Sequence, residues 1–490
     1  MTALQAANPL LWLLAAPLIG AGVLFLLPHW RLAALTNIAV SAVTFGLSLV
    51  LVGQRPEPTA LLFIDDFNVF LVVLTAFVGL GSSIFSAAYI SREGNAKRLA
   101  PPQMRLYHAM YQAFLFTMLL ALTANNIGLL WVAIEAATLT TVMMVSLYRT
   151  RPAIEAAWKY FILCSVGIGL ALFGTILVYM AAQPVLGAGS QAMAWTAMIG
   201  QAGDFQPALL SLAFVFILVG YGTKVGLAPL HNWLPDAHAE GPTPIAAVLS
   251  GLLLNVALYA ILRMKMIVSA NDGAMDPGPF MIAMGLSSLF VAALMLYRRR
   301  DIKRLFAYSS IEHMGIMTFA FGMGGALSNF AGLLHMTMHS LAKSAVFFAV
   351  GLAVQTVGSA RLSDIRGLTV SRPVLGWGLV IGVVAIAGLP PMGIFMSEFL
   401  VVASAFAQQP LLAVPLILAL LLTFGALVMR LQSLAFGEPS PLLGYPVPNP
   451  WVNGVAVAPM VLHLALVVIA GLWLPPALVA WFESVAAMLG

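Results

Sequence analysis

Fourteen long apolar segments restrict the fold of this chain more than any other feature. Each is long enough to cross about 30 Å of hydrocarbon as an α-helix. Because a backbone in hydrocarbon must satisfy its own hydrogen bonds, we predict an all-α integral membrane protein with about 14 transmembrane helices. The segments lie at residues 10–27, 32–53, 67–90, 107–124, 126–147, 156–181, 207–229, 243–268, 279–297, 303–324, 328–356, 374–401, 410–436 and 453–482.

Composition agrees with a membrane protein and excludes several other classes. Of the 490 residues, 61% are hydrophobic and only 8% are charged, whereas soluble domains carry roughly 25% charged residues. The net charge of +5 is no sign of nucleic-acid binding, since the basic residues lie in connecting loops. The single cysteine, Cys164, excludes an internal disulfide and any cysteine cluster for zinc or iron–sulfur.

The positions of lysine and arginine predict the orientation of the helices. If the N-terminus lies outside, 17 of the 22 basic residues fall in inside loops. Only Arg55, Arg263 and Lys265 fall in outside loops, and Lys224 and Lys343 lie within spans. We therefore expect fourteen crossings with both termini outside. No basic residue precedes the first span, so we also expect that it is no cleavable signal.

Two helices are interrupted at corresponding positions. The seventh breaks at GLAPLHNWLPDAH and the twelfth, five spans later, at AGLPPMGIFMSEF. Paired interruptions of this kind are typical of transporters built from inverted repeats. We predict two inverted five-helix repeats, at residues 107–270 (helices 4–8) and 271–437 (helices 9–13). Residues 1–106 would then form helices 1–3, and residues 438–490 would form helix 14.

Lys224 and Glu135 are ionisable residues inside apolar segments. A charge at that depth costs about 3 kcal/mol or more, and such residues usually mark an ion or proton pathway. Pro229 and Pro235 follow Lys224 closely and break its helix. We predict that Glu135 pairs with a cation such as Lys224, and that this pair exchanges protons. The alternatives are a structural helix–helix hydrogen bond for Glu135 and a snorkelling Lys224 near the inside surface.

Three protonatable residues share one face of the eleventh segment. His335, His339 and Lys343 are spaced by four residues, which places neighbours about 6 Å apart on a helix. We predict that they relay protons together with bound water. A metal site is the weaker reading, because neither an HExxH pattern nor a neighbouring carboxylate accompanies the histidines. In the tenth segment, His313 and Glu312 lie so deep that at least one of them is expected to be functional.

The two helix breaks carry further candidates. Glu398 follows the Pro390–Pro391 break and is a candidate terminal proton acceptor; otherwise it is an interfacial carboxylate. His231, Asp236 and His238 follow Lys224. They form either a loop entrance to the pathway or a capped and solvated helix end, and the sequence favours neither.

These motifs resemble the antiporter-like membrane subunits of respiratory complex I, Mrp-type cation/proton antiporters and membrane-bound nickel–iron hydrogenases. The resemblance rests on Glu135, KVGLAPLHNWLPDAHAEGPTP, DIKRLFAYSSIEHMG, HMTMHSLAKSAVFFAVG and GLPPMGIFMSEF, and it spans all but the first two or three helices. Within that family, EGPTPIAAVLSGLLLNVALYAILR and SSIEHMGIMTFAFGMGG look most like component F of hydrogenase-4. The resemblance implies a buried Glu–Lys pair, here Glu135 and Lys224, and a terminal group, here Glu398.

One position departs from the family pattern. Many members carry a lysine in the eighth span, where this chain has Asn255, with Tyr259 one turn along. Both side chains can hold water, but neither takes up a proton near neutral pH. Either water bridges the gap to His335, His339 and Lys343, or the pathway is impaired.

The resemblance implies a proton-translocating, non-redox subunit of a redox complex of the hydrogenase-4 or formate hydrogenlyase type, in a bacterial cytoplasmic (inner) membrane. Protons would move along a Glu–Lys–His–Lys–Glu axis. We expect no cofactor in this chain, and iron–sulfur clusters and a nickel–iron centre in partner subunits. Other membrane subunits and peripheral redox subunits would be its partners. The alternatives are a subunit of a gradient-driven cation/proton antiporter, with Na⁺ as a possible ion, and the proton-coupling subunit of an inorganic-carbon uptake complex.

Overall fold

The computed structural model describes residues 8–442 and 450–490. This part of the chain consists of helices, turns and three isolated bridges, without a β-strand. The helices up to the first break are α1 (Pro9–Leu26), α2 (Trp30–Gly53), α3 (Asp66–Asn95), α4 (Pro101–Thr123), α5 (Ile127–Val145), α6 (Arg151–Leu186), the short α7 (Trp195–Ile199) and α8 (Pro207–Val225). After it come α9 (Trp233–Glu240), α10 (Thr243–Val248), the π-helical turn η3 (Leu249–Leu253), α11 (Leu254–Ser269), α12 (Gly278–Leu296), α13 (Ile302–Met323), α14 (Gly325–Val357), the short α15 (Leu368–Ser371), α16 (Pro373–Ile386), α17 (Gly393–Gln408), α18 (Pro410–Ala435), α19 (Pro450–Leu472) and α20 (Pro476–Leu489).

The predicted number of membrane crossings agrees with these helices. Twelve helices of the described chain are long and apolar enough to span a bilayer, with α10, η3 and α11 forming one continuous crossing. The thirteenth crossing is α13, whose hydropathy is lowered by Lys303, Arg304 and Glu312. The fourteenth is the broken pair α16 and α17, each half too short to span alone. The all-α membrane fold of roughly fourteen helices is confirmed.

Both predicted helix breaks are present. After α8, Gly226 adopts a left-handed conformation with φ of 82°, and α9 begins only at Trp233. After α16, Gly388 has φ of 64°, and α17 begins at Gly393, beyond the two prolines. Glycine suits both positions because a positive φ is strained for residues with a Cβ. The division into two inverted repeats stays a prediction.

The connecting segments gather at two opposite ends of the bundle. At one end, isolated bridges join Leu62 to Ala124 and Asn126 to Ala194. At the other end, a bridge joins Asp301 to Arg361. The bridges thus join the α2–α3, α4–α5 and α6–α8 connections to one another, and the α12–α13 connection to the one after α14. Which end faces the cytoplasm, and which bacterial membrane holds the chain, stay predictions.

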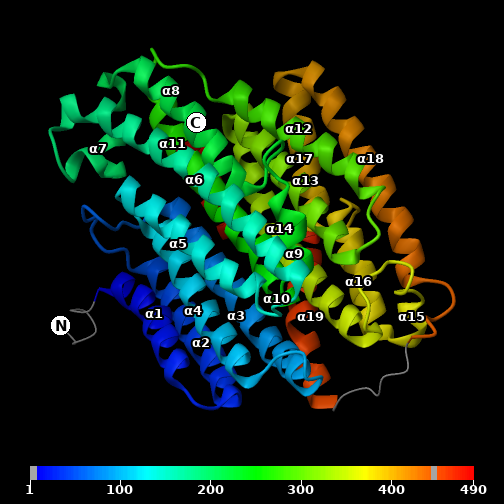
Figure 1. The fold of residues 1–490 in the computed structure, drawn as a ribbon. Helices are drawn as coiled ribbons and strands as arrows, with labels where there is room; N and C mark the ends of the chain where they lie inside the picture. The colour runs from blue at the N-terminus through cyan, green and yellow to red at the C-terminus, as the bar shows by residue number, and fades with distance from the viewer. Residues whose placement is uncertain (1–7, 443–449) are drawn as a thin grey trace.

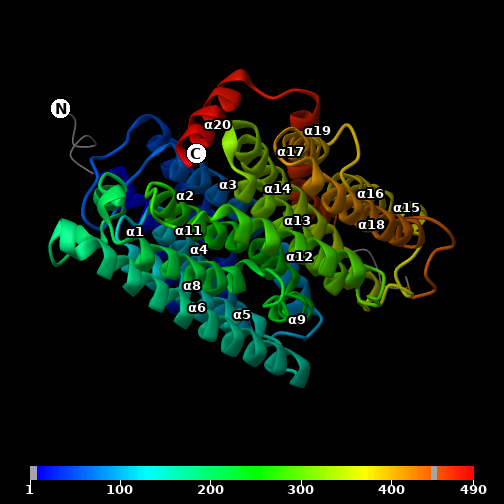
Figure 2. The same ribbon diagram turned by 90° about the horizontal axis from the view of Figure 1, so that it is seen from above.

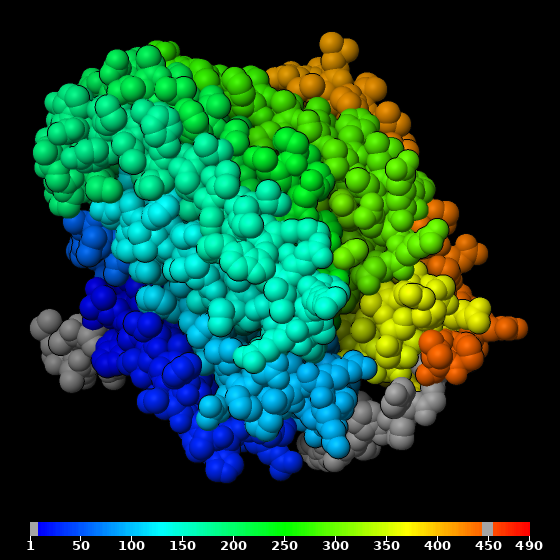
Figure 3. Space-filling model, in the orientation of Figure 1, coloured from blue at the N-terminus to red at the C-terminus, as the bar shows by residue number. Residues whose placement is uncertain are grey.

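Two crossings form the centre of the molecule. The α10–η3–α11 crossing is buried along its whole apolar length, and α14 is buried over most of its own. In contrast, α1, α2, α18 and α19 expose most of their apolar surface, as lipid-facing helices do. Figure 1 shows α11 and α14 amid the other helices, while α6 crosses the front, where its side chains form a continuous part of the surface in Figure 3.

The last predicted segment, 453–482, is divided into two helices. The helix α19 ends at Leu472, and a separate helix, α20, begins at Pro476. Pro475 and Pro476 explain the break, since proline cannot donate the hydrogen bonds that a continuing helix needs. Figure 2 shows α20 lying across the ends of other helices instead of running along them.

Candidate functional site

Lys224 is a fully buried ammonium at the end of α8. Its Nζ donates to Thr138 Oγ1 of α5 at 2.6 Å and to the hydroxyl of Tyr160 of α6 at 2.8 Å. It also lies 4.6 Å from the centre of the Tyr160 ring and 5.8 Å from that of Trp233 in α9. Polar and aromatic contacts therefore hold the charge inside the protein, and the alternative of a snorkelling lysine does not apply.

Glu135 does not form the expected direct pair with Lys224. No ion pair within 4.0 Å joins the two side chains. The half-buried Glu135 carboxylate instead accepts from Ser165 Oγ at 3.3 Å, and its Oε2 has no hydrogen-bond partner among the described residues. Thr138, almost one turn beyond Glu135, takes the lysine contact. A proton passing between Glu135 and Lys224 therefore needs a water molecule or a rotation of the glutamate.

The residues after the α8 break separate into a surface group and a buried group. Asp236 belongs to the surface group, since its carboxylate lies 3.1 Å from Arg304 and 3.4 Å from Lys159. His231 and His238 are buried, and His238 Nδ1 donates to Leu234 O at 2.7 Å. Asp236 is thus paired near the surface, while the two histidines are buried, and their role as an entrance to the pathway stays a prediction.

The second half brings histidines from two helices into direct contact. His313 Nδ1 of α13 lies 3.0 Å from His335 Nε2 of α14, and His335 Nδ1 lies 2.9 Å from Ser397 Oγ of α17. The His339 ring is 5.3 Å from the His313 ring, and neither of its nitrogens has a partner among the described residues. The three rings form a row between α13 and α14, which the Ser397 hydroxyl extends to α17.

Lys343 lies at one end of this row, one turn beyond His339. It is fully buried, and its Nζ donates to the backbone carbonyl of Phe306 in α13 at 3.3 Å. Glu312, also in α13, is 1% exposed and accepts from Ser309 at 3.4 Å. Glu312 therefore adds a buried carboxylate, next to His313 in sequence, that the predicted axis left out.

Glu398 lies at the other end, close to the histidine pair. Its carboxylate rests against Gly388 in the α16–α17 break. One ring nitrogen each of His313 and His335 and one carboxylate oxygen of Glu398 all lie within 4.8 Å of one another. The sequence showed no carboxylate near the histidines, because this one comes from another helix. Since the two histidines hydrogen-bond each other, one of the two facing nitrogens carries a proton, which favours proton transfer over metal ligation.

Asn255 and Tyr259 contact different neighbouring helices. Asn255 Nδ2 donates to Ser340 Oγ of α14 at 2.8 Å, so Asn255 faces the helix that carries Lys343. One turn along, the Tyr259 hydroxyl donates to Leu122 O of α4 at 3.0 Å, and its ring packs on Phe67 of α3. Asn255 therefore lies against the helix of the charged row, whereas Tyr259 contacts α3 and α4.

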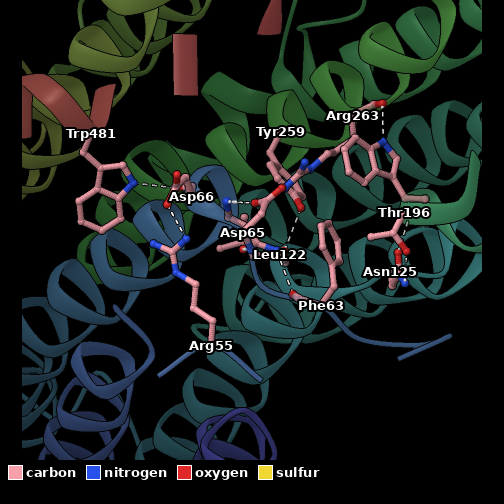
Figure 4. A network of polar contacts seen from close by, with 12 residues as sticks. Arg55, Phe63, Asp65, Asp66, Leu122, Asn125, Thr196, Tyr259, Arg263 and Trp481 are labelled. Carbon is pink, nitrogen blue, oxygen red and sulfur yellow. Dashed lines mark hydrogen bonds and ion pairs between the residues drawn. The ribbon is translucent and has the colours of Figure 1, made fainter. Parts of the chain in front are cut away.

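A separate set of charged and aromatic residues surrounds Arg263 in the second half of α11 (Figure 4). Arg263 NH2 forms an ion pair with Asp65 at 2.7 Å, and its guanidinium lies 4.3 Å from the Trp195 ring and 4.9 Å from the rings of Phe63 and Tyr259. The prediction that Arg263 and Lys265 lie in an outside loop is wrong, because α11 continues to Ser269 and buries both. The carboxylate and the rings compensate the buried guanidinium charge.

Comparisons with known proteins agree with this arrangement. Residues 124–423 match the family model described as NADH:quinone oxidoreductase/Mrp antiporter, transmembrane. The chain is 54% identical to a hydrogenase-4 component F homolog of Methylacidiphilum infernorum, over 96% of this chain and 98% of that protein. It is 28% identical to NADH-quinone oxidoreductase subunit N of Desulforudis audaxviator, over 80% of this chain and 77% of that protein.

A solved structure shows the same fold along the whole chain. It comes from the membrane-bound sulfane sulfur reductase, an archaeal respiratory membrane complex, and it superimposes with a TM-score of 0.86 at 21% identity. The match covers 98% of this chain and 97% of that one. With its broken helices and its buried lysines and histidines, this chain belongs to the NADH:quinone oxidoreductase/Mrp antiporter transmembrane family, and it is similar to hydrogenase-4 component F.

Proposed function

We propose that this chain is a proton-translocating membrane subunit of a multi-subunit redox complex. The observation that carries the proposal is that Lys224 and Lys343 are both fully buried, without a carboxylate within 4.0 Å in the described chain. Leaving a charge in a membrane protein without a counterion is costly. A lysine that gives up its proton and later takes one back is uncharged for part of the cycle and avoids that cost during this time. A buried lysine is therefore well suited to carry protons.

The proposed pathway has two charged groups and a link between them. The first group is Glu135 and Lys224, separated by a gap that water or a glutamate rotation closes. The second group extends from Lys343 through His339, His313 and His335 to Glu398. Hydrogen bonds already connect His313, His335 and Ser397, and protons can move along such a chain when each ring accepts on one nitrogen and donates from the other.

The type of complex is proposed from the relatives. The similarity to a hydrogenase-4 component F homolog supports a complex of the hydrogenase-4 or formate hydrogenlyase type. Partner subunits would then carry the iron–sulfur clusters and the nickel–iron centre, and they would supply the driving force. The matched family also includes Mrp antiporters, so a gradient-driven antiporter is the second candidate.

Purification of the chain with its partners separates these two candidates. A tagged chain at its native level, extracted in mild detergent, should bring down a hydrogenase large subunit and iron–sulfur proteins. If only small membrane subunits accompany it and sodium-dependent proton flux occurs without a redox substrate, the antiporter candidate replaces the redox complex.

Replacing Lys224 tests the proton pathway itself. In proteoliposomes that contain the purified complex and an internal pH-sensitive dye, Lys224→Ala should lower turnover-driven proton flux about tenfold or more. The matched control is Lys97→Asn, which removes a lysine exposed in the α3–α4 connection. Equal flux in the wild type and Lys224→Ala, with the complex intact, would refute a proton pathway through Lys224.

A further inference from the structure

The crossing that separates the two charged groups contains a π-helical turn. This turn, η3, spans Leu249–Leu253 within the fully buried α10–η3–α11 crossing. A π-turn adds one residue to the helix and displaces its backbone hydrogen bonds, and such turns occur often at functional sites. Here the turn contains Ser250 and Gly251, which hydrogen-bond to Ser310 of α13 and Ser340 of α14, the helices that carry most of the second charged group.

Ser250 forms a buried hydroxyl pair with Ser310 of α13. The two Oγ atoms are 2.6 Å apart, and both residues are fully buried. Ser310 Oγ also donates to the backbone carbonyl of Phe306 at 3.0 Å, and the same carbonyl accepts from Lys343 Nζ at 3.3 Å. Since Ser310 Oγ and Lys343 Nζ bind one oxygen atom, they are at most about 6 Å apart, a gap that one water molecule bridges.

A second contact holds η3 against α14. Ser340 Oγ donates to the carbonyl of Gly251 at 2.6 Å and accepts from Asn255 Nδ2 at 2.8 Å. Asn255 Oδ1 is buried and has no hydrogen-bond partner among the described residues. A buried acceptor of this kind is normally satisfied by an ordered water. The turn is therefore fixed in register, and its surroundings are polar enough to hold water.

We infer that the Ser250–Ser310 pair carries protons between the central crossing and Lys343. This inference rests on the proposed function. In the transfer step, the Lys343 ammonium gives a proton to the bridging water, and that water gives one of its own protons to Ser310 Oγ. Ser310 passes its original hydroxyl proton to Ser250, and Ser250 gives its own hydroxyl proton to water held at Asn255. This water passes a proton to neutral Lys224, the acceptor. Rotation of the two hydroxyls then resets the pair. Lys343 loses one proton and Lys224 gains one, while the hydroxyls and the waters end as they began.

If the two hydroxyls carry the proton, substitutions at Ser310 and Ser250 can separate this role from a role in packing. Ser310→Ala and Ser250→Ala should each lower turnover-driven proton flux about tenfold in proteoliposomes of the intact complex. Ser310→Thr, which keeps the hydroxyl, should stay within about twofold of the wild type. The matched control is Ser86→Ala in α3, which removes an equally buried hydroxyl paired with Tyr107 at 2.8 Å.

The outcomes distinguish this inference from the proposed function. If wild-type flux depends on Lys224 but both alanine variants keep it within about twofold, the hydroxyl bridge is refuted and the proton pathway stands. The bridge is also refuted if Ser310→Thr and Ser250→Thr lose as much flux as the alanine variants, since packing then explains the losses. If the wild type moves no protons, or Lys224→Ala equals it, the proposed function itself fails.

Discussion

At the scale of single residues, neutral groups hold the central lysine. Lys224 donates to the hydroxyls of Thr138 and Tyr160 and lies over two aromatic rings, and Glu135 stays outside direct contact. Neutral partners stabilise an ammonium less than a carboxylate does, so they leave the lysine free to lose its proton. Neutral partners are therefore better suited than a permanent ion pair to a lysine that carries protons.

The Tyr160 hydroxyl offers a sharp test of this arrangement. Tyr160→Phe keeps the ring, which stacks on Trp233 at 4.6 Å, but removes the oxygen that binds Lys224 and Thr141. Because a hydrogen bond to a charged group contributes about 1.5–3 kcal/mol, we expect proton flux to fall about tenfold or more. Flux in proteoliposomes of the complex measures this loss.

Tyr111→Phe is the control for that substitution. The Tyr111 hydroxyl is also buried and donates to Gly79 O at 2.6 Å, but it lies between α3 and α4, away from the lysines. It should keep wild-type flux. Equal flux in Tyr160→Phe and Tyr111→Phe would show that the Tyr160 hydroxyl has no part in the pathway.

At the scale of helices, the site depends on the close approach of α6 and α8. A Cβ added to Gly220 would lie 2.7 Å from the carbonyl oxygen of Gly167 and would also meet the backbone of Ala171. Small residues at a crossing let two backbones approach closely, which is how membrane helices gain contact without a hydrophobic driving force. This approach brings Tyr160 of α6 within hydrogen-bonding distance of Lys224.

Gly220→Leu should therefore force α6 and α8 apart. We expect a loss of about 3 kcal/mol in the free energy of unfolding, because the clash is with backbone atoms that cannot move aside. The midpoint of thermal unfolding in detergent measures the effect. Gly169→Leu is the matched control on α6, since a Cβ there meets no atom within 4 Å. Similar midpoints for the two variants would contradict this account of the helix contact.

At the scale of the whole molecule, α20 connects helices that are distant in sequence. Trp481 Nε1 donates to Asp66 O of α3 at 2.9 Å, and Asn329 Nδ2 of α14 donates to Ala486 O at 3.2 Å. Lys265 of α11 donates to Leu489 O at 3.4 Å. The last helix therefore joins the early helices, the central crossing and the second half at one end of the bundle.

Phe482 is the apolar anchor of α20. It is 1% exposed, and its ring lies 4.8 Å from that of Phe70 and 5.9 Å from that of Phe330. We expect Phe482→Ala to lower the free energy of unfolding by about 3–5 kcal/mol, as large-to-small core substitutions do. Thermal unfolding of the purified protein tests this, with Met488→Ala, a 36% exposed position on the same helix, as control. A midpoint for Phe482→Ala as high as that of the control would mean that α20 does not anchor the bundle.

Much of the fold was predictable because its causes are local. Hydropathy indicates each crossing, since every segment must satisfy hydrocarbon by itself. Proline and glycine indicate the breaks after Lys224 and before Glu398, because they act on the backbone where they stand. The helical spacing of His335, His339 and Lys343 likewise predicted their shared face.

The contacts between helices were decided only by the tertiary structure. Thr138 and Tyr160 are ordinary polar residues in their own segments, and nothing along the chain indicates that they bind Lys224. Likewise, the cage around Arg263 and the approach of Glu398 to His313 depend on how α3, α11, α13 and α17 pack. The sequence by itself determined which segments cross the membrane, because each crossing follows from the segment's own hydropathy. Which of them meet was determined by packing between segments far apart in the chain, where a shift of a few ångströms replaces a carboxylate partner with a hydroxyl.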